Sequence, residues 1–401
     1  MQVTAQDITA AAAVVAPHVV RTPTVESRRL GELLGARLHL KLENMQFTGS
    51  FKDRGACNKL QQLVDAGGVK GVIAASAGNH AQGVAYHAQR LGLPATIVMP
   101  QTTPFAKVER TASFGAKVVL QGESLAESAA HARELEAEQG LVYVHPYDDP
   151  AIVAGQGTAA IELFADRPDL DTLVVPIGGG GLISGMAIWA KHKNPHIRVI
   201  GVQTEQCPAM RAKVRGETPP PLGTLTLADG IAVKQPGELT SRIVAQLVDD
   251  ILLVSEEDLE NAVQLLATQQ KVVAEGAGAA GIAAILRHMS LFSNRNVGVV
   301  ICGGNIDRRM LSTVLLRTLK RDGKVAKLRI EIRDVPGVLS RVTQMIGAEG
   351  ADIIDIEHQR LFNNLGPRHA ELDVVMETHG TTHVARILET LKGAGFPARP
   401  V

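Results

Sequence analysis

The chain has 401 residues, in which 41 lysines and arginines balance 41 aspartates and glutamates. This length exceeds that of a usual single domain, so we expect two or three domains, each with its own core. The balanced charge excludes a global field that would favour nucleic acid or an anionic membrane, and it leaves small molecules as the expected partners.

The cysteines and the N-terminus indicate a reducing, cytoplasmic location. Cys57, Cys207 and Cys302 are odd in number and form no C-x-x-C pair, which excludes a thiolate metal cage. No lysine or arginine precedes Arg21, so the basic start of a signal peptide is missing. The uncharged run Leu173–Ala190 contains an irregular glycine loop, and we interpret it as a buried strand and helix rather than a membrane span.

Lys52 stands at the start of a predicted helix, in the hexapeptide Ser50–Gly55. Lysines at helix starts are usually solvated, and the hexapeptide alone favours that interpretation. The neighbouring ring of Phe51 and the loops that follow in the chain add weight to a chemical role for the amine.

Strand-like runs alternate with helical patterns through most of the chain, which predicts an α/β fold with a mostly parallel sheet and helices on both faces. The runs are Val72–Ala75, Ala95–Met99, Lys117–Leu120, Thr172–Ile177, Val199–Thr204 and Val297–Cys302. Ligands of such open sheets bind at the carboxyl ends of the strands. Small residues follow three of these strands, in Ser76–His80, Gly178–Gly181 and Gly303–Asn305, so we expect one cleft there.

Four consecutive glycines, Gly178 to Gly181, lie between a predicted strand and a predicted helix. Such a bare loop can turn its N–H groups onto an anion, and the helix N-terminus adds partial positive charge, so the loop predicts a phosphate site. The dinucleotide fingerprint fails because Leu182, Ile183 or Ser184 stands where its last glycine is required. A wide turn without a ligand is the simpler alternative for the glycines taken alone.

The choice of cofactor follows from the glycines and Lys52 together. An NTPase would need a lysine directly after the glycine loop, where this chain has Leu182. Pyridoxal phosphate needs an anchor for its phosphate and an amine for its aldehyde. The pattern therefore favours pyridoxal phosphate over ATP.

The sequence texture changes near residue 320. The basic segment Arg317–Arg329 lacks the interleaved aromatics of a nucleic-acid surface, so we interpret it as a solvated linker. The pattern after it predicts a strand at Leu328–Arg333, a helix, two strands around a hairpin turn at 363–367, a second helix and a short strand at Phe396–Ala398. This is the split βαβ, or ferredoxin-like, order.

Three parts of the chain are therefore expected. A catalytic domain covers residues 1–320 and contains a smaller subdomain at about 70–150. A linker at 321–327 leads to a small α+β domain over 328–401.

Taken together, these motifs resemble the threonine dehydratases of the pyridoxal-phosphate fold-type II, or tryptophan-synthase β-like, group. The resemblance covers nearly all of residues 15–312 and lies in the lysine hexapeptide, in the Ser-Ala-Gly-Asn-His-Ala-Gln loop from Ser76, in the glycine loop and in the Cys-Gly-Gly-Asn turn from Cys302. It implies a catalytic domain of two open twisted sheet subdomains, with pyridoxal phosphate as the cofactor.

The resemblance also implies a role for each cofactor-binding residue. Lys52 carries the cofactor covalently, Phe51 packs against its ring, Asn79 bonds its ring hydroxyl and Glu275 lies near the ring edge. The residues implied around the phosphate are Gly178, Gly179, Gly180, Gly181 and Leu182.

Cys302 is implied to face the pyridine nitrogen of the cofactor. A thiol is a weak hydrogen-bonding partner and cannot act as the carboxylate that keeps that nitrogen protonated. We therefore expect a moderate electron sink, which suffices for loss of a β-hydroxyl.

The implied reaction is the α,β-elimination of L-threonine to 2-oxobutanoate and ammonia, with L-serine giving pyruvate as a side activity. Lys52, its pKa lowered by burial and nearby positive charge, takes the Cα proton, and Ser76 is the second catalytic candidate. The expected substrate-binding residues are Ser76, Ala77, Gly78, Asn79, His80 and Gln156.

Two enzyme classes of the same fold fit the sequence less well. Serine racemases carry a serine as a second base where this chain has Ala77, and β-replacement enzymes similar to cysteine synthase usually have a threonine in place of His80. The divalent cation site of some relatives is matched by Glu205 and Ala209, but Arg211 replaces its second acid. We therefore expect no divalent metal, and binding of a monovalent cation stays open.

Residues 328–401 resemble an ACT domain, with Asp334–Val338 as its first loop. Such modules usually pair and bind an amino acid at their interface. The resemblance thus implies a homodimer or homotetramer and feedback control, with isoleucine or valine as the natural effector if the enzyme serves isoleucine biosynthesis. A purely structural role in dimerisation, and a catalytically idle amino-acid sensor that keeps the fold, are the alternatives.

Overall fold

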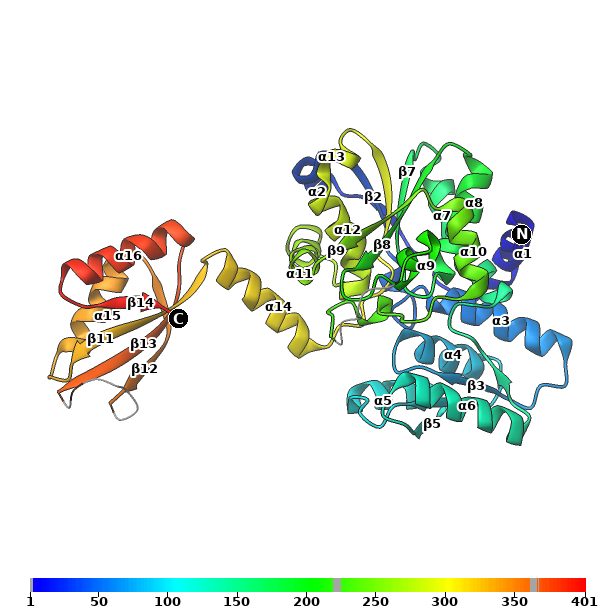
Figure 1. Ribbon diagram of the computed structural model, residues 1–401, viewed down its shortest axis with the longest axis horizontal. Coiled ribbons are helices and arrows are strands. Elements are labelled where there is room, and N and C mark those ends of the chain that lie inside the picture. The colour runs from blue at the N-terminus through cyan, green and yellow to red at the C-terminus, as the bar shows by residue number, and fades with distance from the viewer. Residues whose placement is uncertain (1–2, 219–224, 361–365, 367) are drawn as a thin grey trace. The chain divides into compact units, whose positions relative to one another are not determined.

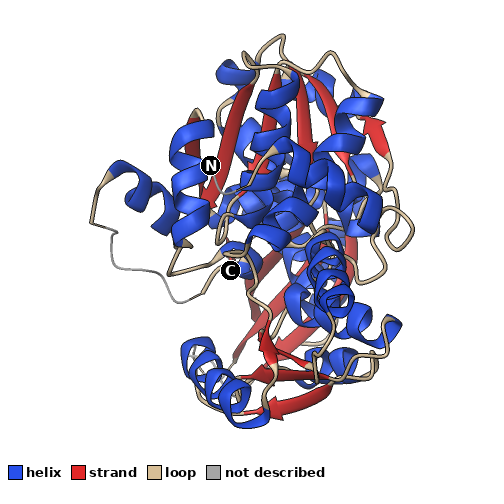
Figure 2. Cartoon of the chain, turned by 90° about the vertical axis from the view of Figure 1, so that its right-hand side faces the viewer, coloured by secondary structure: helices blue, strands red, loops and turns tan. Residues whose placement is uncertain are grey.

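The computed structural model describes residues 3–218, 225–360, 366 and 368–401. The chain divides into two compact units, residues 1–306 and 307–401. Figure 1 labels their elements, and Figure 2 shows that helices flank the sheets. No described helix is long and apolar enough to cross a membrane.

The larger sheet of the first unit has six strands in the order β1-β2-β10-β7-β8-β9. Their bounds are β1 Thr24–Glu26, β2 Arg37–Lys41, β7 Thr172–Pro176, β8 Arg198–Thr204, β9 Asp250–Val254 and β10 Asn296–Val300. All neighbours are parallel except β1 and β2. Every residue of β7 and β10 is buried, as expected for parallel strands covered on both faces, and α8 and α12 lie on opposite faces in Figure 1.

The smaller sheet of the first unit has four parallel strands in the order β5-β4-β3-β6. Their bounds are β3 Val72–Ala75, β4 Ala95–Met99, β5 Lys117–Leu120 and β6 Val142–Tyr143. Its core joins strand residues such as Val72 and Ile97 to Leu60 and Val84 on the helices that cover the sheet.

Thirteen α-helices surround these two sheets within the described part of the first unit. They are α1 Ala5–Val15, α2 Arg28–Leu34, α3 Lys52–Ala66, α4 Asn79–Arg90, α5 Phe105–Ala112, α6 Leu125–Gln139, α7 Pro150–Asp166, α8 Gly181–Lys193, α9 Ala209–Arg215, α10 Glu238–Leu247, α11 Glu256–Leu265, α12 Gly276–Arg287 and α13 Met289–Phe292. Side-chain caps fix several starts. At α7, Asp149 accepts from the N–H groups of Ala151 and Ile152, and Pro150 occupies the first turn, the preferred chemistry of a helix N-terminus.

The predicted parallel α/β architecture is confirmed. Three predicted strands, β3, β4 and β5, have the predicted bounds, and the other three differ by one or two residues at an end. The sequence prediction missed β1, β2, β6 and β9, of which β1 and β6 have only three and two residues. Strands this short leave little apolar pattern to detect.

The second unit follows the order β11-α15-β12-β13-α16-β14 after helix α14. The bounds are α14 Arg308–Arg321, β11 Val325–Arg333, α15 Val338–Ala348, β12 Asp352–Gln359, β13 His369–Glu377, α16 Thr381–Gly393 and β14 Ala398–Pro400. The four strands pair antiparallel in the order β12-β13-β11-β14. This confirms the predicted ferredoxin-like fold, with a core that includes Leu328, Leu372, Val342 and Ile387.

The unit boundary differs from the expected domain bounds. Helix α14 belongs to the second unit, so this unit begins at Asp307 rather than at 328, and only residues 322–324 separate α14 from β11. The sequence pattern could not locate this boundary, because the apolar period of a helix does not show which of two domains the helix packs with. The predicted turn at 363–367 lies, apart from Gly366, outside the described residues.

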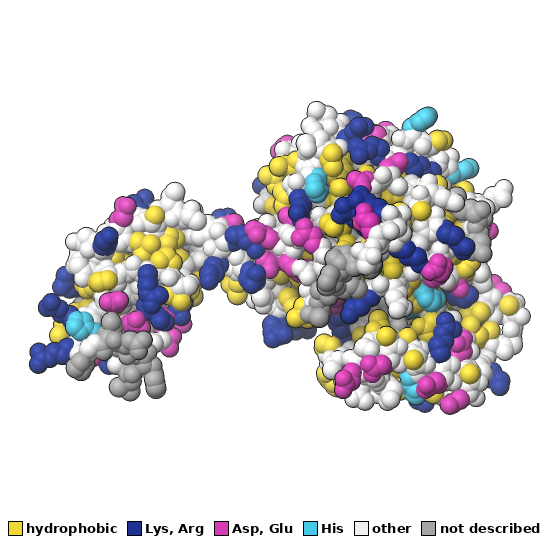
Figure 3. All heavy atoms as spheres, viewed as in Figure 1, with side chains coloured by type: hydrophobic (Ala, Val, Ile, Leu, Met, Phe, Trp, Pro, Cys, Tyr) yellow, Lys and Arg dark blue, Asp and Glu magenta, His cyan; other side chains and the backbone are white. Residues whose placement is uncertain are grey.

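Basic and acidic side chains are interspersed over the face of the first unit in Figure 3. That face therefore presents no large field of a single sign, in agreement with the balanced composition.

Candidate active site

Two loops that are far apart in the sequence lie side by side at the start of α3. The N–H of Phe51 donates to the carbonyl of Cys302 at 3.0 Å, and Ser50 forms an isolated β-bridge with Gly303. The N–H of Gly304 donates to the carbonyl of Gly49 at 3.0 Å. These backbone bonds fix the lysine hexapeptide against the turn that follows β10.

Lys52 is the first residue of α3, and its Nζ donates to the carbonyl of Pro146 at 2.6 Å. The same Nζ lies 5.1 Å from the centre of the Phe51 ring. Burial lowers the pKa of Lys52 to about 8. Because no carboxylate forms a salt bridge with this amine among the described residues, Lys52 loses its proton far more readily than an ordinary lysine, as a nucleophile or base must.

The loop from Ser76 to His80 leads from β3 into α4. Ser76 through Asn79 are partly exposed, as residues lining an open cleft would be, and the Ser76 hydroxyl accepts from the N–H of Gly78 at 3.2 Å. His80 is buried, and its Nε2 lies 2.9 Å from the carbonyl of Val144, which assigns the ring proton to Nε2. Burial, with the charge of Lys52, lowers the pKa of His80 to about 3, so the ring stays neutral.

Asn79 forms a chain of hydrogen bonds with Glu275 and Asn305. Its amide nitrogen donates to Glu275 Oε1 at 2.7 Å, and its oxygen accepts from the Asn305 amide at 2.6 Å. Burial raises the pKa of Glu275 to about 7. The three side chains come from three separate parts of the chain. The structure brings Asn79 and Glu275 into contact, as we expect of two residues that bind the same cofactor.

Cys302 is buried beside Lys52 at the end of β10. Burial, reinforced by the nearby Glu275 carboxylate, raises the pKa of the Cys302 thiol well above its usual value. The thiol therefore stays neutral and can only be a weak hydrogen-bonding partner.

The glycine loop ends at the N-terminus of α8. Gly180 is the N-cap of this helix and has φ +95°, in the region that glycine favours. A Cβ at Gly179 would collide with Tyr147 and one at Gly180 with Thr240, and a Cβ at Gly181 would lie in tight contact with Tyr147. The loop therefore has little room for side chains. It lies at the N-terminus of a 13-residue helix, where the partial positive charge and the free N–H groups fit a phosphate group.

Two predicted contacts have buried side chains. Gln156 is 1% exposed, and its side-chain oxygen accepts from the N–H of Gly55 at 3.2 Å between α3 and α7. Leu182 is buried in the first turn of α8. The geometry thus gives Gln156 a packing role between helices, and it stays a prediction as a substrate contact.

The structure also places residues near the cleft that the sequence prediction did not include. Asn305 stands in the turn after Cys302 and bonds Asn79, so its position in that motif was the available signal. Tyr147 and Thr240 contact the glycine loop, and Asp148 accepts from the N–H of Thr240. The contact of Thr240 with Gly179 could not be predicted from the sequence, because it depends on how α10 packs against the glycine loop.

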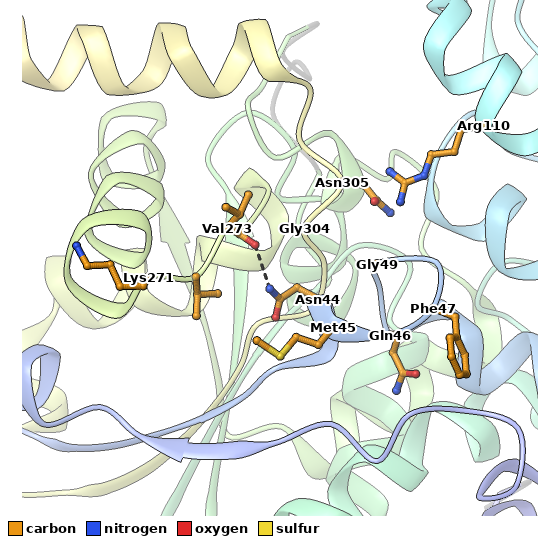
Figure 4. Close-up of a pocket in the computed structure, with 11 residues that line it drawn as sticks. Asn44, Met45, Gln46, Phe47, Gly49, Arg110, Lys271, Val273, Gly304 and Asn305 are labelled. Atoms are coloured by element: carbon orange, nitrogen blue, oxygen red, sulfur yellow. Dashed lines mark hydrogen bonds between the residues drawn. The ribbon is translucent and has the colours of Figure 1, made fainter.

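A cavity of about 400 Å³ borders the site on the side of Asn305. Figure 4 shows Asn305 and Gly304 at its wall, with Arg110 from α5 and Lys271 on opposite sides and the Lys271 amine turned away. The other lining residues are Asn44, Met45, Gln46, Phe47, Gly49, Val272 and Val273.

Glu205, which the resemblance matches to a cation ligand, forms an ion pair. Glu205 accepts from the Arg287 guanidinium at 2.7 Å. Among the described residues, no group of three or more histidines, cysteines, aspartates and glutamates could hold a metal ion.

Known proteins match most of the chain. The family model for pyridoxal-phosphate dependent enzymes matches residues 15–303. An L-threonine ammonia-lyase of Thermotoga maritima is 42% identical over 400 residues and covers 100% of both chains. A threonine deaminase of T.th., known from a crystal structure, has a TM-score of 0.71 and 41% identity, covering 76% of this chain and 99% of that one. Maize serine racemase has a TM-score of 0.73 and 34% identity, covering 80% and 99%.

Proposed function

The chain belongs to the family of pyridoxal-phosphate dependent enzymes, and we propose that it is a threonine ammonia-lyase. It converts L-threonine to 2-oxobutanoate and ammonia, and L-serine to pyruvate as a side reaction. The observation that carries the proposal is the placement of Lys52 at the start of α3, where its amine donates to the Pro146 carbonyl at 2.6 Å and its segment is hydrogen-bonded to the Cys302 turn. The full-length match to the Thermotoga maritima ammonia-lyase supports it.

The proposed cofactor contacts follow the cleft. Lys52 holds the cofactor covalently and Phe51 packs against its ring. The glycine loop, continued by Leu182, binds the phosphate through backbone N–H groups at the start of α8. Asn79, Glu275 and Cys302 would contact the ring, with Cys302 as a weak hydrogen-bonding partner of its nitrogen.

The proposed chemistry needs a site for the substrate carboxylate, a base for the Cα proton and a proton for the β-hydroxyl, which leaves as water. When bound, pyridoxal phosphate supplies the electron withdrawal that makes the Cα proton acidic. Lys52 takes that proton, for which a pKa near the working pH is favourable. Ser76 and the N–H groups of residues 77–80, at the start of α4, bind the substrate carboxylate.

Serine racemisation is the alternative that the solved structures make relevant. Racemisation needs a second proton donor on the opposite face of the substrate, and Ala77 offers no hydroxyl at the position where such a donor is implied. Elimination needs only the Lys52 face, so it fits these residues better.

The experiment is to incubate the purified holoenzyme with L-threonine or L-serine and to identify the products. We expect 2-oxobutanoate from threonine, a smaller yield of pyruvate from serine and no D-serine. One methyl group in an apolar pocket discriminates by about 1–3 kcal/mol, so both substrates should react. D-serine as the main product would establish the racemase instead, and the absence of any reaction would favour an amino-acid sensor or β-replacement.

The second unit is proposed to be an ACT-like regulatory domain, which binds isoleucine or valine in a homodimer or homotetramer. Its βαββαβ order and antiparallel sheet support this. Adding isoleucine or valine to the threonine assay should change its rate, and a variant ending at residue 306 should lose that response. An unchanged rate with either amino acid would leave a structural role for the unit.

A further inference from the structure

Residues 145–148, here called the strap, connect the smaller sheet to α7 and touch three parts of the site. The Pro146 carbonyl accepts from Lys52 Nζ at 2.6 Å. The Tyr147 ring packs against Gly179, and its hydroxyl donates to the carbonyl of Gln235 at 2.7 Å. The strap therefore contacts both the amine and the loop that the proposed function assigns to the cofactor.

Asp148 connects the strap to a helix about ninety residues away. Its carboxylate accepts from the N–H of Glu238 at 3.0 Å and from the N–H of Thr240 at 3.1 Å. These are first-turn donors of α10, whose N-cap, Gly237, has no side chain to satisfy them. A Cβ at Gly237 would collide with the Asp148 carboxylate, so Asp148 takes the place of a local cap.

Helix α10 in turn holds the glycine loop. The Thr240 hydroxyl donates to the carbonyl of Gly179 at 2.6 Å. Asp148 thus reaches the glycine loop through Thr240, while two residues earlier the same strap holds Lys52.

His145 fixes the shape of the strap. Its Nδ1 accepts from the N–H of Tyr147 at 3.2 Å and from the N–H of Asp148 at 2.7 Å. The ring is therefore neutral with its proton on Nε2, and the four residues form a rigid turn rather than a loose connection.

We propose that Asp148 is a positioning residue, which caps α10 from the strap and so sets the distance between the Lys52 amine and the phosphate-binding loop. This inference rests on the proposed roles of Lys52 and Gly178–Gly181. Without the Asp148 carboxylate, the start of α10 loses its cap, and the Tyr147 contacts alone hold the glycine loop and the segment before α10 to the strap.

The test compares Asp148→Ala with Asp149→Ala in the full-length holoenzyme. The two acids are adjacent, and each caps a helix, but Asp149 caps its own helix α7 and pairs with Lys59. Two quantities are measured: the phosphorus NMR signal of the bound cofactor and the rate at which the holoenzyme loses cofactor on dilution. Thermal melting of each variant reports the purely structural effect.

We expect Asp148→Ala to shift or broaden the phosphorus signal and to lose cofactor about tenfold faster or more, the range for losing charge-assisted hydrogen bonds. Asp149→Ala should lower the melting temperature but keep the wild-type signal and rate. A wild-type signal and rate in Asp148→Ala, or equal changes in both variants, would overturn the inference.

A milder variant covers the case in which Asp148→Ala does not fold. Asp148→Asn keeps one acceptor oxygen but turns an amide N–H₂ toward the second N–H, so we expect a smaller change in the same direction. An unchanged signal in Asp148→Asn would then count against the inference. Failure of the proposed function is distinguishable, because it would change the products of the wild-type assay, whereas the phosphorus signal and the rate of cofactor loss report the effect of Asp148 whichever reaction the enzyme catalyses.

Discussion

Two neighbouring residues of α3, Lys52 and Arg54, lie in opposite electrostatic surroundings. Arg54 is fully buried and donates to both oxygens of Glu43, at 2.7 and 2.8 Å, and to both oxygens of Glu162, at the same distances. Lys41 adds a second cation, 2.5 Å from Glu162. Burial raises the pKa of Glu43, but contact with Arg54 outweighs burial and the net pKa lies below the ordinary value.

The Lys52 side of the helix has no such pairing. Burial is the main cause of every shift there: it lowers the pKa of Lys52 and raises those of Glu275 and Cys302. All three shifts favour the neutral form. The same helix start therefore serves two purposes. The paired charges of Arg54 stabilise the fold, whereas the unpaired side contains groups, Lys52 and Glu275, that exchange protons near neutral pH.

The strongest way to break this comparison is to remove the paired cation. Arg54→Met should destabilise the first unit by about 3–5 kcal/mol, because Glu43 is left as a buried, poorly compensated charge and Glu162 keeps only Lys41 as its partner. Urea unfolding of the full chain measures the change in the free energy of unfolding of the first unit. The matched control is Arg21→Met, which removes a surface pair with Asp166 worth about 0–1 kcal/mol, and an Arg54 variant no less stable than this control would contradict the pairing account.

Glu275 offers a test on the unpaired side. Its folded pKa of about 7 lies above the ordinary value of 4.5, so its contribution to stability is fully present below about pH 4.5 and is lost as the pH rises through about 7. Glu275→Gln should remove this loss and be more stable than the wild type above pH 7, by about 3 kcal/mol at most. Thermal melting of the cofactor-free chain across this pH range measures it, and parallel curves for both proteins would refute the shift.

The second unit shows paired charge on a sheet rather than a helix. Arg329 donates to both oxygens of Asp373 at 2.7 and 2.8 Å across strands β11 and β13, which lowers the pKa of Asp373 to about 2. This stability is present above the ordinary value of 3.8 and is lost as the pH falls through about 2. Asp373→Asn should cost about 1–2 kcal/mol at neutral pH, since Arg329 is partly solvated.

Melting of the second unit measures this cost. Asp322→Asn is the control, because it breaks only an exposed 3.9 Å pair with Lys324. Equal melting of the two variants would count against a contribution from Asp373.

The smallest expected effect is that of a chelator. The Glu205 carboxylate is already neutralised by Arg287 at 2.7 Å, so EDTA should leave the rate of 2-oxobutanoate release unchanged. A rate that falls with EDTA and returns with magnesium or calcium would show that the ion pair gives way to a cation.

Sequence patterns located the loops of the site for a physical reason. β7 and β10 are neighbouring parallel strands that end at a common edge, so the segments that carry Gly178 and Cys302 had to approach one another. β3 lies in the smaller sheet, so the resemblance, rather than a shared edge, assigned Asn79 to the site. The C-terminal fold was predictable because each of its strands and helices has its own apolar period.

Contacts between distant elements could not be predicted in this way. No local pattern says that Asp148 caps α10, although Gly237 leaves that helix without a side-chain cap. Gln156 illustrates the opposite case: its motif suggested the cleft, whereas its side chain packs against Gly55 in the contact between α3 and α7.

The most direct test of the account is to find which lysine carries the cofactor. The holoenzyme is reduced with borohydride, digested and analysed by mass spectrometry for the pyridoxyl phosphate group. We predict the group on Lys52, where burial lowers the pKa of the amine, and none on Lys41 or Lys59, whose amines are held by Glu162 and Asp149. Labelling of either of these lysines in place of Lys52 would contradict the assignment of the site.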